Sequence, residues 1–160
     1  MKHNFFAGIG YDIHRFSGKR RLILGGVNIP YRYGLAGHSD ADVLLHAVAD
    51  AILGAAGLGD IGIHFPSTDA RYKNISSRII LAASYGLCRR KGFSVNNVDC
   101  TVIAQEPKIS KFSPEMKKNI AGILKTAGVN IKATTNEKLG AIGRKQGIAC
   151  LAIATLIKKR

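Results

Sequence analysis

The sequence lacks tryptophan and contains only four prolines in 160 residues. We find no internal repeat, no low-complexity segment and no linker in it. A chain of this length can bury about two-thirds of its unfolded surface in one core. A hydrophobic content of 46% is ordinary for a globular protein. We therefore expect a single domain spanning residues 1–160.

Cysteines and long apolar runs are also scarce. Cys88, Cys100 and Cys150 form an odd set without a CxxC pair, which excludes a disulfide framework. Cys100 and Cys150 stand in apolar surroundings and are expected to be small core residues. The longest apolar run, residues 148–157, is far shorter than the ~20 residues of a membrane-spanning helix. With no stretch typical of a signal peptide, we expect a soluble, cytoplasmic protein without a membrane partner.

Acidic residues are few: ten Asp and Glu stand against 24 Lys and Arg, a formal net charge of +14. The basic residues are scattered and form no block of five, so there is no basic tail. No DNA- or RNA-binding signature accompanies them, and aromatic residues make up only 7%. We predict no nucleic-acid partner, although the charge alone keeps a basic nucleic-acid-binding module as an alternative. A phosphorylated substrate is compatible with the charge.

One stretch, residues 38–46, holds two histidines and two aspartates. We interpret Ser39 and Asp42 as a capping box that starts a helix over about residues 41–56. His46 lies one turn beyond Asp42 on the same helical face. His38 stands beside the free N–H groups of the helix start, where an anion is favoured.

A second motif, Asp12-Ile13-His14, lies in a predicted strand. Residues two apart in a strand point to the same side, so Asp12 and His14 should project together. With His46 they make two imidazoles and one carboxylate. Three protein ligands with an open fourth position are the usual composition of a catalytic zinc site. On spacing alone, three unrelated polar residues remain the alternative.

The hydrophobic patterns predict an α/β chain with a mixed sheet and helices packed on one face. Expected strands cover residues 5–14, 21–24, 27–29, 94–104, 129–135 and 148–157, and expected helices follow at 76–91 and from Ser113 to Gly128. The last strand is nearly all apolar, which is typical of burial on both faces. Residues 57–62 match GxGxxG, but a helix precedes them and Pro66 follows. We interpret them as a flexible connection and reject a dinucleotide site.

Several motifs occur in a fixed order along the chain. They are Gly10-Tyr11-Asp12-Ile13-His14, His38-Ser39-Asp40 through His46, Gly59-Asp60-Ile61-Gly62 with residues 65–69, residues 104–108, residues 132–140 and Gly147-Ile148-Ala149-Cys150. Over about residues 8–158 the chain resembles the 2-C-methyl-D-erythritol 2,4-cyclodiphosphate synthase family. The co-occurrence of these motifs makes the resemblance specific.

The resemblance implies a homotrimer with three active sites at subunit boundaries. It implies the substrate 4-diphosphocytidyl-2-C-methyl-D-erythritol 2-phosphate, a cytidine diphosphate compound of the non-mevalonate isoprenoid pathway. The 2-phosphate attacks the β-phosphorus of the same molecule, giving 2-C-methyl-D-erythritol 2,4-cyclodiphosphate and CMP. The expected activity is that of a phosphorus–oxygen lyase.

The resemblance also implies roles for individual residues. Asp12, His14 and His46 match ligands of Zn²⁺ or another divalent transition metal, and Glu137 matches a ligand of a second ion, Mg²⁺ or Mn²⁺. His38 and Thr135 match transition-state stabilisers. The positions matched to substrate binding are Ser39, Asp60, Ile61, Gly62, Phe65, Pro66, Ser67, Thr68, Asp69, Ala104, Gln105, Glu106, Pro107, Lys108, Ile109, Ser110, Thr134, Asn136, Ala141 and Arg144.

The chain departs from the family pattern at three positions. Asn136 stands where a third threonine is common, Ala141 where an aromatic residue is frequent, and Gln146 where an acid is frequent. By the resemblance, Ala141 and Gln146 match the rim of a cavity on the trimer axis that holds isoprenoid diphosphates in the family, so these two departures leave such binding open for this chain. A zinc hydrolase is the competing enzyme class, and Asp42 or Asp50 would be its base.

Overall fold

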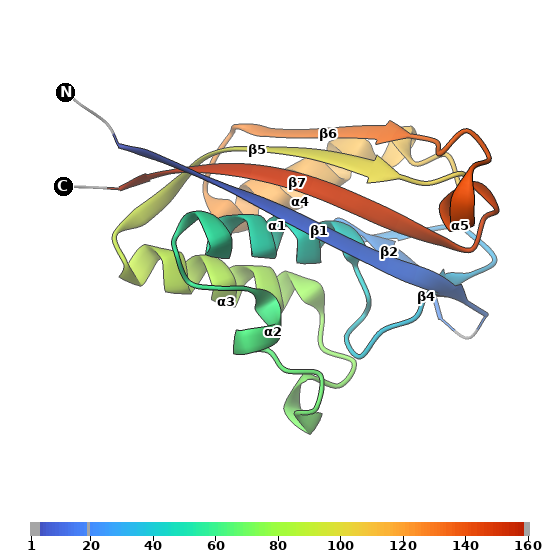
Figure 1. Ribbon diagram of the computed structural model, residues 1–160, viewed down its shortest axis with the longest axis horizontal. Coiled ribbons are helices and arrows are strands. Elements are labelled where there is room, and N and C mark those ends of the chain that lie inside the picture. The colour runs from blue at the N-terminus through green and yellow to red at the C-terminus, as the bar shows by residue number, and fades with distance from the viewer. Residues whose placement is uncertain (1–3, 19, 159–160) are drawn as a thin grey trace.

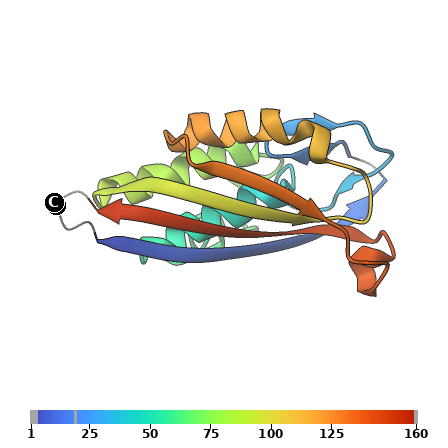
Figure 2. The ribbon, with the colours of Figure 1, turned by 90° about the horizontal axis from the view of Figure 1, so that it is seen from above.

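The computed structural model describes residues 4–18 and 20–158. Its main sheet has the order β4-β1-β7-β5-β6. The strands are β1 (Phe5–Ser17), β4 (Gly34–Leu35), β5 (Phe93–Ile103), β6 (Val129–Thr134) and β7 (Gly147–Lys158). β5 and β6 pair in parallel and the other neighbours are antiparallel, which confirms the predicted mixed sheet. Figure 2 shows the long strands running side by side.

The three long helices lie on one face of this sheet, as predicted (Figure 1). They are α1 (Val43–Ala55), α3 (Ser77–Arg90) and α4 (Ser113–Leu124). Shorter elements are the hairpin strands β2 (Leu22–Leu24) and β3 (Val27–Ile29), the helices α2 (Ile61–His64) and α5 (Gly140–Gly143), and the 3-10 turns η1 (Ala70–Tyr72) and η2 (Ser110–Phe112). No helix in the described part of the chain is long and apolar enough to cross a membrane.

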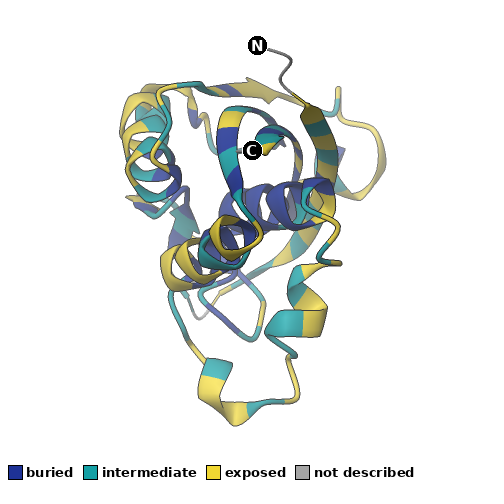
Figure 3. Ribbon diagram, turned by 90° about the vertical axis from the view of Figure 1, so that its left-hand side faces the viewer, coloured by how far each residue is buried: buried dark blue, intermediate teal, exposed yellow. Residues whose placement is uncertain are grey.

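Helix α1 is the centre of the core. It is buried almost throughout and lies between the sheet and α3, where Figure 3 shows it in dark blue. Such an all-round apolar helix must be covered on every side. The three cysteines are free and buried, which confirms the prediction that Cys100 and Cys150 are core residues.

The cap of α1 differs from the predicted capping box. Asp42 is the N-cap, and its Oδ1 accepts from the Leu45 N–H at 3.1 Å. The same carboxylate accepts from Gly25 at 2.9 Å and Gly26 at 2.7 Å, in the β2–β3 turn. The Ser39 hydroxyl instead accepts from Ala41, two residues on. Only a carboxylate has enough acceptor sites to serve the helix start and the turn together, which explains why Asp42 takes the cap.

The backbones of β1 and α1 lie in direct contact. A Cβ atom at Gly10 would lie 1.9 Å from the Ala47 carbonyl oxygen, and one at Gly8 would lie 2.2 Å from that of Ala51. Only glycine fits at these two strand positions, because the neighbouring atoms are helix backbone and cannot rotate away. This contact sets the distance between the α1 and β1 backbones.

Strand β7 is not buried on both faces, contrary to the prediction from its apolar sequence. Alternate residues face α1, while Leu151 and Ile153 are exposed on the other side. They pair with Tyr11 and Ile9 of β1, which are exposed as well. We call Ile9, Tyr11, Ile13, Leu151 and Ile153 the outer sheet patch.

The end of α4 and the connection at residues 57–62 also differ from the sequence predictions. Helix α4 ends at Leu124, before Gly128, because Lys125 adopts the left-handed conformation with φ 55°. Within residues 57–62 the connection is not wholly irregular, since Asp60 caps α2 through the Ile63 N–H at 3.1 Å.

The contact between β1 and α1 gives a stability prediction. Gly10→Ala should lower the free energy of unfolding by about 3 kcal/mol, because the helix must move away from the strand. Gly54→Ala is the matched control in α1, where an added Cβ meets nothing within 4 Å. It should raise stability by about 0.5–1 kcal/mol. Urea denaturation of the two variants measures both values. A Gly10→Ala variant as stable as the wild type would contradict the contact.

Candidate metal centre and substrate cavities

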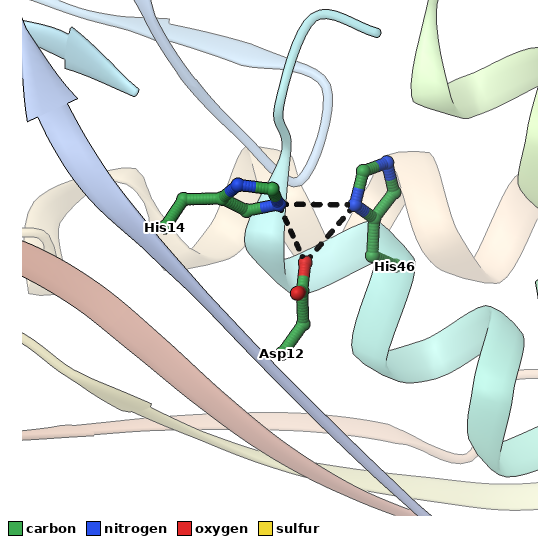
Figure 4. Close-up of side chains that lie close together, drawn as sticks. All are labelled: Asp12, His14 and His46. Carbon is green, nitrogen blue, oxygen red and sulfur yellow. Dashed lines mark hydrogen bonds and ion pairs between the residues drawn. The ribbon is translucent and has the colours of Figure 1, made fainter. Parts of the chain in front are cut away.

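Three side chains from β1 and α1 meet beneath the sheet (Figure 4). Asp12 and His14 project from the same side of β1, as their spacing predicts, and His46 comes from the second turn of α1. Asp12 Oδ2 lies 2.9 Å from His14 Nε2 and 3.0 Å from His46 Nδ1. The two nitrogens are 3.4 Å apart. The structure therefore brings together the three residues that the sequence singled out.

The triangle of ligand atoms has the dimensions of a metal site. Ligand atoms about 2.0–2.1 Å from a tetrahedral zinc ion lie about 3.3 Å from one another. The three observed separations, from 2.9 to 3.4 Å, are close to that value. Two imidazoles and one carboxylate also suit several divalent transition metals. These residues therefore fit a divalent metal ion with one coordination position left for another ligand.

The orientation of His14 supports the same conclusion. Its Nδ1 donates to the Ala36 carbonyl at 2.7 Å. With the proton held there, Nε2 keeps its lone pair, and Nε2 is the atom that faces Asp12 and His46. A backbone acceptor behind the ring is the usual arrangement for a metal-binding histidine.

The charges of the centre are coupled. Burial favours a higher pKa for Asp12, but hydrogen bonds and electrostatic attraction from His14 and His46 outweigh it and lower the pKa to about 2. For His14, burial favours a lower pKa, but the carboxylate of Asp12 raises it overall. Asp12 is therefore ionised at neutral pH, as a metal ligand must be.

The centre opens into a cavity of about 250 Å³. His38 and Ser39 line it beside the metal ligands. Of the predicted substrate positions, it also contains Ile61, Gly62, Phe65 and Ser67. The His38 Nε2–H donates to the Asp69 carbonyl at 3.1 Å, which ties the histidine to the segment carrying Phe65 and Ser67.

A second cavity, of about 220 Å³, contains eight of the other predicted positions. Ala104, Gln105, Pro107, Lys108, Ile109, Ser110, Thr134 and Thr135 line it. The two cavities share no lining residue. Within one chain, His38 and Thr135 therefore lie in different cavities.

The remaining predicted positions line neither cavity. Asp60 caps α2, Asp69 pairs with Arg71, and Pro66 and Thr68 lie in the same exposed loop. Glu137 accepts from the Thr135 hydroxyl at 2.7 Å on an exposed turn, and the neighbouring Asn136 bonds to the Leu139 carbonyl. Glu106 bonds to Tyr31 and Lys145, while Ala141 and Arg144 are exposed in and after α5.

Sequence reasoning missed three lining residues: Tyr72 and Ile80 in the first cavity and Ala133 in the second. Tyr72 ends η1, and its ring lies against Phe65 with centroids 5.4 Å apart. The only signal in the sequence for Tyr72 as a cavity residue was its position as an aromatic residue shortly after the polar loop. Ile80 and Ala133 carry no signal beyond ordinary apolar patterning.

The fold and the site define an α/β protein in which three residues that could hold a metal ion open into a cavity. More narrowly, the chain belongs to the YgbB family, whose model matches residues 5–157. It is 55% identical over 156 residues to the 2-C-methyl-D-erythritol 2,4-cyclodiphosphate synthase of Geobacillus thermodenitrificans, covering 96% of this chain and 98% of that protein.

Solved structures show the same likeness. The IspF–CDP complex of Plasmodium falciparum superposes with a TM-score of 0.86 at 38% identity, covering all of both chains. The bifunctional IspDF of Campylobacter jejuni gives a TM-score of 0.95 at 47% identity, covering 99% of this chain but 43% of that longer one.

The metal centre predicts a specific loss of metal binding. His46→Ala should abolish stoichiometric Zn²⁺ binding, because it removes one of three ligands. His64→Ala is the control, since His64 bonds to the Leu58 carbonyl and lies outside the centre. Zinc content after gel filtration, measured by mass spectrometry, separates the two variants. Full zinc retention by His46→Ala would show that the triad is not the metal site.

Proposed function

We propose that the protein converts 4-diphosphocytidyl-2-C-methyl-D-erythritol 2-phosphate to 2-C-methyl-D-erythritol 2,4-cyclodiphosphate and CMP. The observation that carries the proposal is the Asp12-His14-His46 centre opening into a cavity, in a chain 55% identical to a synthase of that name. A complex of a similar protein with CDP supports the choice of a cytidine diphosphate substrate.

The proposed reaction joins two phosphates of one molecule. An oxygen of the 2-phosphate forms a bond to the β-phosphorus, and the bond from that phosphorus to the oxygen of CMP breaks. The attacking group is already ionised, so the protein must align and neutralise anions rather than activate a nucleophile. When bound, Zn²⁺ and a second ion, Mg²⁺ or Mn²⁺, supply Lewis-acid stabilisation of the diphosphate oxygens.

The residues that line the two cavities, together with Glu137, bind different parts of the substrate and the second ion. His38 and Ser39 donate to diphosphate oxygens beside the metal centre. Residues 61–67 hold the methylerythritol carbon chain, and residues 104–110 hold the cytidine. Thr135 donates to the charge that develops in the transition state, as fixed hydrogen-bond donors do. Glu137, next to the Thr135 hydroxyl, holds the second ion.

The structure gives no support to the hydrolase alternative. Its two candidate bases do not line the metal cavity. Asp42 is fully buried, and its oxygens accept three backbone N–H groups. Asp50 accepts from the Ile61 N–H at 2.8 Å and so anchors the start of α2. Both carboxylates are structural, which matches a reaction that needs no base.

We propose further that the active enzyme is a homotrimer with its sites at subunit boundaries. Two observations support this. Within one chain, the cavity at the metal centre and the second cavity, which residues 104–110 line in part, share no residue. A substrate that fills one cavity of each kind can therefore lie between two chains. The outer sheet patch exposes Ile9 at 67%, Tyr11 at 52% and Ile153 at 50%, and an apolar face of this kind is typical of a subunit contact. We also propose a cytoplasmic location, which the likeness to a bacterial synthase supports.

Product identity tests the proposed reaction. The purified protein with Zn²⁺ and Mg²⁺ should release one CMP per substrate and form a cyclic diphosphate, identified by phosphorus NMR. Chelation of the metals should abolish turnover, and their return should restore it. A linear product of phosphate hydrolysis would contradict the proposal in favour of the hydrolase.

Assembly tests the outer sheet patch. Ile153→Lys should shift the protein to monomers in sedimentation velocity, because a charge in a buried contact costs several kcal/mol. Ile79→Lys, at a residue 56% exposed on α3, is the matched control and should leave the trimer intact. A wild type that sediments as a stable monomer would contradict the trimer.

A further inference from the structure

A partly buried network of hydrogen bonds lies behind His46, on the side away from the metal centre. His46 Nε2 lies 2.9 Å from Ser77 Oγ, and the Ser77 hydroxyl donates to Asp40 Oδ1. The other oxygen of Asp40 accepts from the Ser77 backbone N–H at 3.0 Å. Ser77 is the first residue of α3 and is fully buried. This network therefore joins the loop before α1, the start of α3 and the metal centre.

Asp40 is the acceptor at the end of these hydrogen bonds, and it determines the direction in which the Ser77 and His46 protons point. The Ser77 hydroxyl has one proton, and it is donated to Asp40 Oδ1. The Ser77 oxygen then presents a lone pair to His46, and His46 must donate its Nε2–H. A neutral imidazole with its proton on Nε2 keeps a lone pair on Nδ1. Nδ1 lies 3.0 Å from Asp12 Oδ2, to which it donates when it is protonated; a bound metal ion would take the place of that proton, and the proton on Nε2 would stay.

The same proton order affects Ser39, which lines the metal cavity. Its Oγ lies 3.1 Å from the same His46 Nε2 and accepts from Ala41 at 3.1 Å. The single Nε2–H is shared between the Ser77 and Ser39 oxygens in a three-centre hydrogen bond, so the Ser39 oxygen accepts as well. Within residues 4–18 and 20–158, no other acceptor bonds to the Ser39 hydroxyl. Its proton is therefore available to an anionic oxygen in the cavity.

We propose that Asp40 and Ser77 are positioning residues that set which nitrogen of His46 carries the proton. They thereby prepare two groups at once: the Nδ1 lone pair for the metal ion and the Ser39 hydroxyl as a donor to a phosphate oxygen. Neither residue lines the cavity, so neither touches the substrate. The inference deepens the proposed function, because it rests on the metal centre described above.

Metal affinity is the first test. Ser77→Ala should weaken Zn²⁺ binding about 10- to 100-fold, the usual effect of removing the partner of a metal-binding histidine. Competition with a chromophoric chelator measures the dissociation constant. Two serines of the same region serve as controls. Ser76→Ala removes the α3 cap and Ser84→Ala removes a buried hydroxyl without a partner, and neither residue contacts His46. Both controls should bind zinc as the wild type does.

A spectroscopic test follows the proton itself. In the zinc-loaded, ¹⁵N-histidine-labelled protein, His46 should show a slowly exchanging Nε2–H resonance. Ser77→Ala should lose that protection, and the Michaelis constant for the substrate should rise because Ser39 loses its preferred orientation. If circular dichroism shows that Ser77→Ala does not fold, Asp40→Asn takes its place. The amide of that variant is a weaker acceptor for the Ser77 hydroxyl than the carboxylate is.

The outcomes separate this inference from the proposed function. A wild type that binds no Zn²⁺ would overturn the metal centre itself. A wild type that binds Zn²⁺, together with Ser77→Ala and Asp40→Asn variants of unchanged affinity and an unchanged His46 resonance, would overturn the positioning role alone. Weaker zinc binding with loss of the protected proton, absent from both control variants, is the result that we expect.

Discussion

The close approach of α1 to β1 is the constraint on which the rest of the structure depends. Gly8 and Gly10 let the helix backbone lie directly on the strand, where any side chain would collide with a carbonyl oxygen. Asp12 lies two residues beyond Gly10 and His14 lies four residues beyond it, so both side chains project from the face of β1 that Gly10 turns to the helix. His46 emerges from the helix one residue before Ala47, the residue that contacts Gly10. The metal centre therefore exists because two glycines remove the space that usually separates a helix from a sheet.

Acidic side chains near the centre have distinct tasks that follow from their surroundings. Asp12 faces two imidazoles and stays ionised. Asp42 faces backbone N–H groups of the β2–β3 turn and the helix start, and burial raises its pKa against their effect. Asp40 faces the start of α3 and Ser77. In a chain with only ten acidic residues, three of them thus fix the geometry of one helix start and its metal ligands.

The sequence predicted local patterns well and long-range contacts poorly. The spacing of Asp12 and His14 predicts a shared face because strand geometry has a period of two residues. The capping box was wrong because Asp42 gains its partners from a turn 16 residues away, which no local pattern reveals. Burial of β7 was overestimated because an apolar sequence does not reveal that Leu151 and Ile153 are exposed on the face away from α1. The contact between Ser77 and His46 could not be predicted from the sequence, since it spans 31 residues.

The central proposal is one catalytic site, built around the Asp12-His14-His46 centre and completed by a neighbouring chain. A crystal structure of the protein with Zn²⁺ and CDP, using anomalous diffraction at the zinc edge, tests it most directly. We predict an anomalous peak about 2.0–2.2 Å from Asp12 Oδ2, His14 Nε2 and His46 Nδ1. CDP should reach from that peak to residues 104–110 of a neighbouring chain. A peak away from the triad, or CDP held by both cavities of the same chain, would contradict the account.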